Sequence, residues 1–141
     1  AERILIFGSG SAQSHVASEF KRIFLPVNKP MFHIYGNDMV TALCKSAKTD
    51  DLVVIFSLTG EEKSILSLAE YLRLKQVPSV SVTRMQNNSL ASLCGENLYI
   101  NSIRIPMEYG IDYEIVTPYF ILIELLFLRY QIYVGEQKST I

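Results

Sequence analysis

Apolar runs of strand length alternate with segments of helical period along the whole chain. Short apolar runs between glycine, proline or polar residues predict strands. The clearest is 52–56, an unbroken apolar run that fits a parallel sheet covered on both faces. The predicted strands cover residues 3–7, 31–34, 52–56, 79–83 and 97–100.

Apolar residues three or four positions apart predict helices between these strands. We expect Asp38 and Ser89 to cap two of them, because short polar side chains accept hydrogen bonds from the first free N–H groups. Residues 101–114 show no periodicity and are predicted to be irregular. The helices are predicted at 11–24, 39–47, 61–75, 90–94 and 116–134; the expected inner side of 61–75 carries Ile65, Leu66, Leu68, Ala69 and Leu72.

This alternation predicts an α/β fold, a three-layer αβα sandwich with a mostly parallel, flavodoxin-like sheet. Ligands of such sheets bind outside the carboxyl ends of the strands. The important loops are therefore those that follow Phe7, Ile34, Phe56 and Thr83.

The composition fits one globular domain over residues 1–141, with 49% apolar and 19% charged residues. A net charge of −1 argues against a nucleic-acid surface within these residues. The longest apolar stretch, 119–128, contains Glu124 and is too short to span a membrane. No signal peptide opens the chain, so we expect a cytoplasmic protein.

The two cysteines, Cys44 and Cys94, lie in apolar segments without a CxxC spacing. They are predicted to be buried thiols in a reducing compartment, and neither a disulfide nor a metal site is expected.

Two loops carry the candidate chemistry: Gly8–Gln13 after the first strand and Ser57–Glu62 after the clearest strand. Both are rich in hydroxyls and glycine, and both lead into a predicted helix. Glycine lets the backbone approach an anion, and the helix N-terminus offers free N–H groups. Two such loops side by side suit a phosphate ester, although each hydroxyl could instead be an ordinary helix cap.

Two other phosphate-binding motifs fit poorly. The dinucleotide fingerprint needs a glycine where Gln13 stands, and a P-loop needs a lysine soon after Gly10, whereas the first is Lys21. No nucleotide cofactor is therefore expected.

The order and spacing of these motifs resemble the sugar isomerase (SIS) domain. The resemblance is carried by Ile4–Ser11, by Val53–Glu62, and by Ser79–Thr83 followed by Asn88-Ser89-Leu90-Ala91. The chain looks most like the C-terminal effector domain of RpiR-type transcriptional regulators. That resemblance implies a helix-turn-helix domain N-terminal to this chain, through which alone DNA would be bound.

The resemblance also implies a set of ligand-binding positions. Ser57 and Thr59 match the two phosphate-binding hydroxyls of the family, and Gly60 matches its turn glycine. Ser11, beside Gly10, matches the hydroxyl of the first loop, with Ala12 as the alternative register. Glu62 departs from the pattern, because the family usually has threonine there; a carboxylate repels a phosphate unless it turns away or meets a cation.

Three functions compete on this basis. The first is an effector domain that senses a phosphorylated sugar. The second, a sugar-phosphate isomerase, needs a positioned base, and no candidate is paired with another in a catalytic spacing. The third is a ligand-less dimerisation module, since the apolar last helix must be buried somewhere. We expect the sensor, as a homodimer or higher oligomer. The candidate bases are His15, His33, Glu108 and Glu114, and the expected dimer contacts are Tyr119, Ile123, Leu126 and Tyr130.

Overall fold

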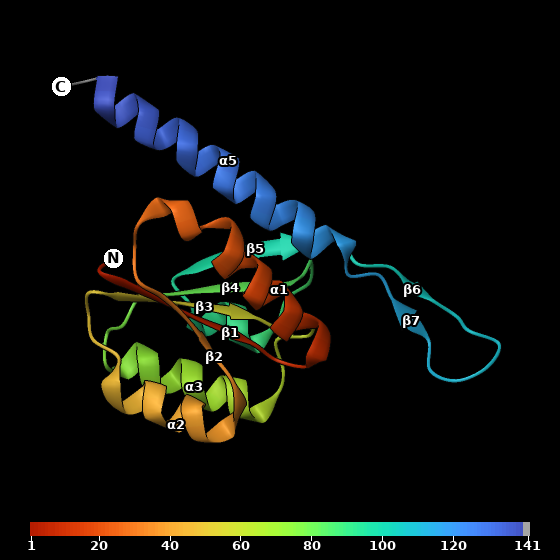
Figure 1. Cartoon of the computed structure of the whole chain (residues 1–141). Helices are drawn as coiled ribbons and strands as arrows, with labels where there is room; N and C mark the ends of the chain where they lie inside the picture. The colour runs from red at the N-terminus through yellow and green to blue at the C-terminus, as the bar shows by residue number, and fades with distance from the viewer. Residues whose placement is uncertain (140–141) are drawn as a thin grey trace. The chain divides into compact units, whose positions relative to one another are not determined.

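A five-stranded parallel sheet lies at the centre of the first part of the chain (Figure 1). The computed structural model describes residues 1–139; residues 140–141 and the side chains of Asn37, Cys44 and Ser139 lie outside the description. The chain divides into two compact units, Ala1–Asn101 and Ser102–Ile141, and each is described by itself.

The five strands follow the order β2-β1-β3-β4-β5, and all four neighbouring pairs are parallel. This is the flavodoxin-like order, in which the chain first moves to one side of β1 and then crosses to the other. The predicted α/β class with a parallel, flavodoxin-like sheet is confirmed. The strands are β1 (Arg3–Gly8), β2 (Met31–Ile34), β3 (Asp51–Phe56), β4 (Ser79–Arg84) and β5 (Glu96–Ile100).

Helices cover both faces of this sheet. In Figure 1, α1 lies on one side of the strands, while α2 and α3 lie on the other. The short helix α4 packs beside α3. These elements are α1 (Ser11–Ile23), a 3₁₀ turn (Leu25–Val27), α2 (Gly36–Ser46), α3 (Lys63–Leu74) and α4 (Ser89–Leu93).

The core lies on both sides of β3, as its unbroken apolar run predicts. Ile55 belongs to the cluster beneath α2 and α3, whereas the ring of Phe56 contacts that of Phe20 on α1, with their centres 6.1 Å apart. The expected inner side of the third helix is also found. Four of its residues are fully buried, namely Ile65, Leu68, Ala69 and Leu72.

Two predicted caps are wrong. The second helix begins at Gly36, so Asp38 lies inside its first turn. The cap of α4 is Asn88 instead of Ser89, because the Asn88 side chain accepts the hydrogen bond from Ala91 N at 2.8 Å. The third helix begins at Lys63, two residues later than predicted, which leaves Glu62 at its cap position.

The second unit contains a β-hairpin where the sequence predicts irregular chain. Strands β6 (Arg104–Ile105) and β7 (Tyr113–Glu114) pair antiparallel. The last helix, α5 (Thr117–Ser139), extends five residues beyond its predicted end at Val134. Within the described residues, no helix is long and apolar enough to cross a membrane.

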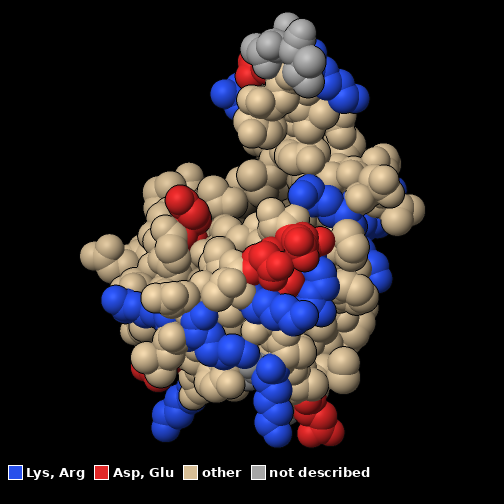
Figure 2. Space-filling view, turned by 90° about the vertical axis from the view of Figure 1, so that its left-hand side faces the viewer, with Lys and Arg blue, Asp and Glu red and all other residues tan. Residues whose placement is uncertain are grey.

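Surface charge is mixed where it can be seen, and one of the two thiols can be compared with the sequence. On the face shown in Figure 2, basic side chains lie among acidic and uncharged ones. Cys94 is buried, and burial raises the pKa of its thiol, so it is a poor nucleophile. The Cys44 side chain, also predicted to be buried, lies outside the described residues.

Candidate functional site

The strand order creates a switch point between β1 and β3. The chain leaves these neighbouring strands toward opposite faces of the sheet, α1 to one and α3 to the other, so that the two loops diverge at the carboxyl edge, where sheets of this kind bind ligands. Ser9 N donates to Phe56 O at 2.9 Å, which joins the start of one loop to the end of the neighbouring strand. The two hydroxyl-rich loops of the sequence are therefore brought to the same place.

In the first loop, glycine permits a very tight turn into α1. A Cβ at Gly8 would lie 2.2 Å from the backbone oxygen of Gln13. Gly10 has φ +93°, and a Cβ there would lie 2.8 Å from Gln13 Oε1. The first turn of α1 thus packs directly against the loop. The Gln13 side chain is buried and lies next to Gly10. Sequence reasoning used Gln13 only to exclude a dinucleotide motif and missed this role.

In the second loop, Ser57 organises the turn. Its hydroxyl oxygen is fully buried; it accepts a hydrogen bond from Gly60 N at 2.9 Å and donates one to Glu62 Oε2 at 2.7 Å. Thr59 Oγ1 accepts a longer bond, 3.3 Å, from Glu61 N. The turn therefore places two hydroxyls and several backbone N–H groups at the start of α3, the arrangement suited to an anion.

A third loop, between β4 and α4, supports the second. Leu90 N donates to Gly60 O at 3.0 Å. Asn88 Nδ2 donates to Thr83 Oγ1 at 2.9 Å, which fixes the side chain that caps α4. These bonds hold Gly60 and its turn against α4.

Glu61 clamps the same two loops together from outside. Its carboxylate accepts bonds of 2.8 Å from both the backbone N–H and the hydroxyl of Ser89, and these bonds lower the pKa of Glu61. The supporting role of Glu61 was not predicted from the sequence. Its position next to Glu62 does not indicate a contact with Ser89, which lies in another loop.

The predicted ligand-binding residues differ in accessibility. Gly10 and Ser11 are exposed, Thr59 and Glu62 are half-buried, and Ser57 is buried together with Gly60. Among the described residues, no side-chain hydrogen bond joins the first loop to the second. The structure brings the loops to one edge, and the ligand role of these residues stays a prediction.

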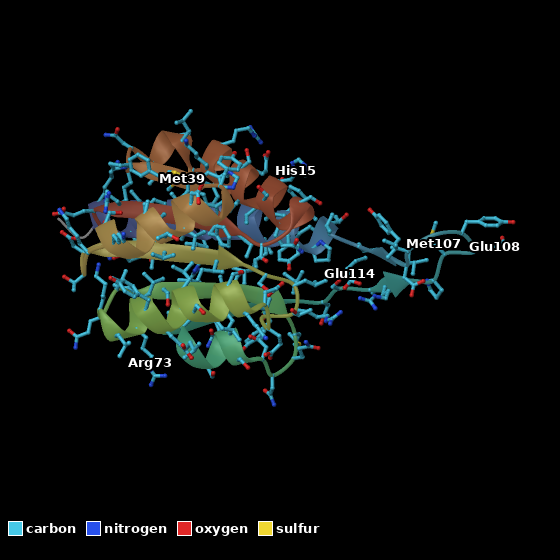
Figure 3. The ribbon with its side chains drawn as sticks, turned by 90° about the horizontal axis from the view of Figure 1, so that it is seen from below. His15, Met39, Arg73, Met107, Glu108 and Glu114 are labelled. Atoms are coloured by element: carbon cyan, nitrogen blue, oxygen red, sulfur yellow. The ribbon has the colours of Figure 1, made fainter. Side chains whose placement is uncertain are left out.

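The candidate bases are dispersed. His15 on α1 is exposed, and Figure 3 shows Glu108 close to the end of the hairpin. Glu114 accepts a bond from Ser102 Oγ at 2.5 Å and pairs with Arg104 at 3.3 Å, so its carboxylate is held by the hairpin itself.

His33 ends near the first loop, with Nε2 at 3.5 Å from Ser14 Oγ and its ring against Tyr35. Burial is the main cause that lowers the pKa of His33, and Lys21 adds to it, so the ring is neutral at pH 7. Among the described residues, no hydrogen bond joins His33 to another of the candidate bases, and we assign it no catalytic role.

Two open depressions, of about 480 and 550 Å³, lie at the other edge of the sheet. They are lined by residues at the starts of β3, β4 and β5, among them Leu52, Pro78 and Glu96. Ligands of parallel sheets bind at the carboxyl edge, so the loops at the switch point are the better candidate.

The chain is thus a doubly wound domain with glycine- and hydroxyl-rich loops at its switch point, the place where folds of this class bind small molecules. The SIS domain model matches residues 1–129, and the chain belongs to the SIS domain family. Over 139 residues it is 32% identical to the HTH-type transcriptional regulator GlvR of Bacillus subtilis, covering 99% of this chain and 55% of GlvR.

Two solved structures share the fold. The NanR protein of Vibrio vulnificus, complexed with ManNAc-6P, has a TM-score of 0.81 at 21% identity, covering 99% of this chain and 52% of NanR. The sugar isomerase domain of an RpiR transcription factor from Sphaerobacter thermophilus has a TM-score of 0.82 at 13% identity, covering 99% and 75%. The chain thus spans about half the length of GlvR and NanR.

Proposed function

We propose that this chain is the sugar-phosphate-sensing effector and dimerisation domain of a transcriptional regulator of carbohydrate metabolism. It acts in the cytoplasm and reaches DNA only through a domain outside these residues. The observation that carries the proposal is the pair of hydroxyl-rich loops at the switch point. GlvR, similar over nearly the whole chain, is a regulator of the helix-turn-helix type, and NanR, of the same fold, was solved with a phosphorylated sugar.

In this proposal the phosphate of the sugar lies at the start of α3. The hydroxyls of Ser57 and Thr59 donate to it, Gly60 provides the tight turn, and Gly10 and Ser11 approach from the neighbouring loop. Hydroxyls and backbone N–H groups hold an anion without a cationic side chain, as at other helix N-termini.

The arrangement favours sensing over isomerisation. Proton transfer between adjacent carbons needs a base within hydrogen-bond reach of the substrate. Glu114 is held by Ser102 and Arg104, and Glu108 and His15 are exposed. We therefore expect binding of a sugar phosphate without turnover.

The double substitution Ser57→Ala with Thr59→Val tests the site. Removing two donors to a charged group is expected to weaken binding of the sugar phosphate at least ~150-fold, because each such bond contributes about 1.5–3 kcal/mol. Calorimetric titration with glucose 6-phosphate, fructose 6-phosphate and ManNAc-6P measures the loss.

The matched control is Ser67→Ala, which removes an exposed hydroxyl from α3 and should leave the affinity unchanged. Unaltered binding by the double variant would place the ligand elsewhere, and consumption of the sugar by the parent chain would favour the isomerase.

For the dimer we propose a contact face on α5 that differs from the one predicted from the sequence. Tyr119 and Ile123, which the sequence predicts to form the contact, are buried. A second stripe on α5, two positions removed and hence on the opposite face, is more than half exposed. Its residues are Ile121, Leu125, Leu128 and Ile132.

Successive residues of this stripe are four, three and four positions apart, which is the spacing of the apolar seam in a coiled coil. Glu124 and Arg129 flank it at positions that face each other across two parallel helices. Two copies of α5 therefore complement each other in charge as well as in apolar surface. We propose that a second copy of this chain covers the exposed stripe.

Charge reversal tests this contact. Glu124→Arg and Arg129→Glu are each expected to shift the monomer–dimer equilibrium toward the monomer, because like charges then meet twice across the two-fold axis. The combined variant should restore the dimer. Sedimentation at micromolar concentrations measures all four proteins; a monomeric parent, or a combined variant as weak as the single ones, would contradict the parallel seam.

A further inference from the structure

The hydroxyl that the proposed function assigns to the phosphate is already engaged within the chain. Ser57 Oγ donates to Glu62 Oε2 at 2.7 Å and accepts from Gly60 N at 2.9 Å. A serine hydroxyl has a single proton to donate. While Glu62 holds that proton, Ser57 has none left for a ligand.

The same carboxylate also opposes the ligand by its charge. An ionised carboxylate beside a phosphate dianion is unfavourable at any short distance, and the cost increases where water is scarce. Among the described residues, no cationic side chain pairs with Glu62. Glu62 and the phosphate therefore compete for one donor and repel each other.

The Glu62 side chain can move away from Ser57 without destabilising α3. It lies at the cap position of α3, yet its side chain caps no backbone N–H there. Its side chain is half-buried, so solvent borders it. Its neighbour Glu61, by contrast, is fixed on Ser89 by two bonds of 2.8 Å. Of the two adjacent acids, only Glu62 touches the proposed phosphate position.

We infer that Glu62 is an internal competitor for the phosphate: its carboxylate occupies Ser57 in the free protein and must be displaced before a phosphorylated sugar binds. This inference rests on the proposed function. Glu62 then sets the affinity of the sensor, so that only a sugar with enough further contacts, or at high enough concentration, displaces it. It selects for the whole ligand and against inorganic phosphate alone.

Titration calorimetry of the parent chain, Glu62→Thr and Glu62→Gln tests the inference with glucose 6-phosphate, fructose 6-phosphate and ManNAc-6P. Glu62→Thr replaces the acid by a hydroxyl donor and is expected to bind the preferred sugar phosphate at least ~10-fold more tightly, the effect of one regained bond to a charged group. Glu62→Gln removes the repulsion but keeps an acceptor for Ser57, so its gain should be smaller.

Glu70→Gln is the matched control, because it removes the same charge from an exposed position two turns along α3. It should change the dissociation constant less than about twofold. In a Ser57→Ala background, Glu62→Thr should lose the part of its gain that comes from releasing the Ser57 hydroxyl and keep the part that comes from the relieved charge repulsion, so the two substitutions should be non-additive.

The outcomes separate the two proposals. If the parent binds a sugar phosphate and Glu62→Thr binds it no more tightly, the competitor role is rejected and the proposed function stands. If Glu70→Gln tightens binding as much as Glu62→Thr, the effect is general charge and the inference is again rejected. If neither the parent nor Glu62→Thr binds any of the three sugars, the proposed function itself fails, and the inference falls with it.

Discussion

Replacing Arg3 by leucine is expected to lower the free energy of unfolding by about 2–4 kcal/mol. Arg3 Nε and Nη2 donate to the two carboxylate oxygens of Asp51 at 2.9 and 2.6 Å. The Asp51 side chain is 1% exposed, whereas that of Arg3 is 34% exposed. Leucine would leave a buried carboxylate with only the backbone N–H of Lys48 as a donor. Water entering on the Arg3 side keeps the cost below that of a fully buried pair.

The surface pair Arg22–Glu19 provides the control. Its arginine side chain is 71% exposed, and Arg22→Leu should cost less than about 1 kcal/mol, because exposed ion pairs contribute little. Urea denaturation of both variants, followed by circular dichroism, gives the comparison. Equal losses would mean that Asp51 is solvated in solution and that β1 and β3 are not held together by this pair.

The ion pair between Arg3 and Asp51 also predicts that the stability of the fold depends on pH. The hydrogen bonds from Arg3 are the main cause that holds the pKa of Asp51 below its usual value. The folded state therefore keeps Asp51 ionised at a pH where the unfolded chain binds a proton. The resulting stability is present above about pH 4 and is lost as the pH falls through the lowered pKa. Arg3→Leu should remove this contribution, so that its stability falls less steeply below about pH 4 than that of the parent.

The sheet could be predicted from the sequence because its signal is local and repeated. Each strand is a short apolar run, and each following helix carries an apolar face, as Ile65, Leu68 and Leu72 show on α3. Burial on both faces of β3 removes alternation from residues 52–56, so the run itself indicates a central parallel strand. The strand order then brings the two hydroxyl-rich loops together without any further signal.

What the sequence could not predict depends on contacts that form only once the loops and turns have folded. The hairpin has strands of two residues, too short for a period of two to be seen. Asn88 rather than Ser89 caps α4, because Thr83 fixes its amide from another element. The hydrogen bond from Ser57 to Glu62 needs the turn at Gly60 to bring them together; from the sequence, Glu62 is only an acid near a helix start. The candidate site residues could therefore be named from the sequence, whereas the hydrogen bond between Ser57 and Glu62 could not be predicted from it.

Gly60→Ala is expected to destabilise the first unit by about 2–4 kcal/mol, from left-handed strain together with the loss of a cap. Gly60 has φ +69°, and a Cβ would lie 2.2 Å from Asn88 Oδ1 and 2.5 Å from its Cγ. Asn88 must move, and it would then release both Ala91 N, at the start of α4, and Thr83 Oγ1. Thermal and urea unfolding measure the loss.

A double-mutant cycle with Asn88→Gly separates the two causes. Glycine is tolerated at a helix cap at a cost of only a few tenths of a kcal/mol relative to asparagine, and it removes every Asn88 atom that the new Cβ would meet. In that background Gly60→Ala should cost only the strain of φ +69°, about 1 kcal/mol. Equal costs in both backgrounds would show that Asn88 does not lie against the turn. A smaller cost shows instead that Asn88 lies against the turn, so that the Ser57–Gly60 turn and the start of α4 are energetically coupled.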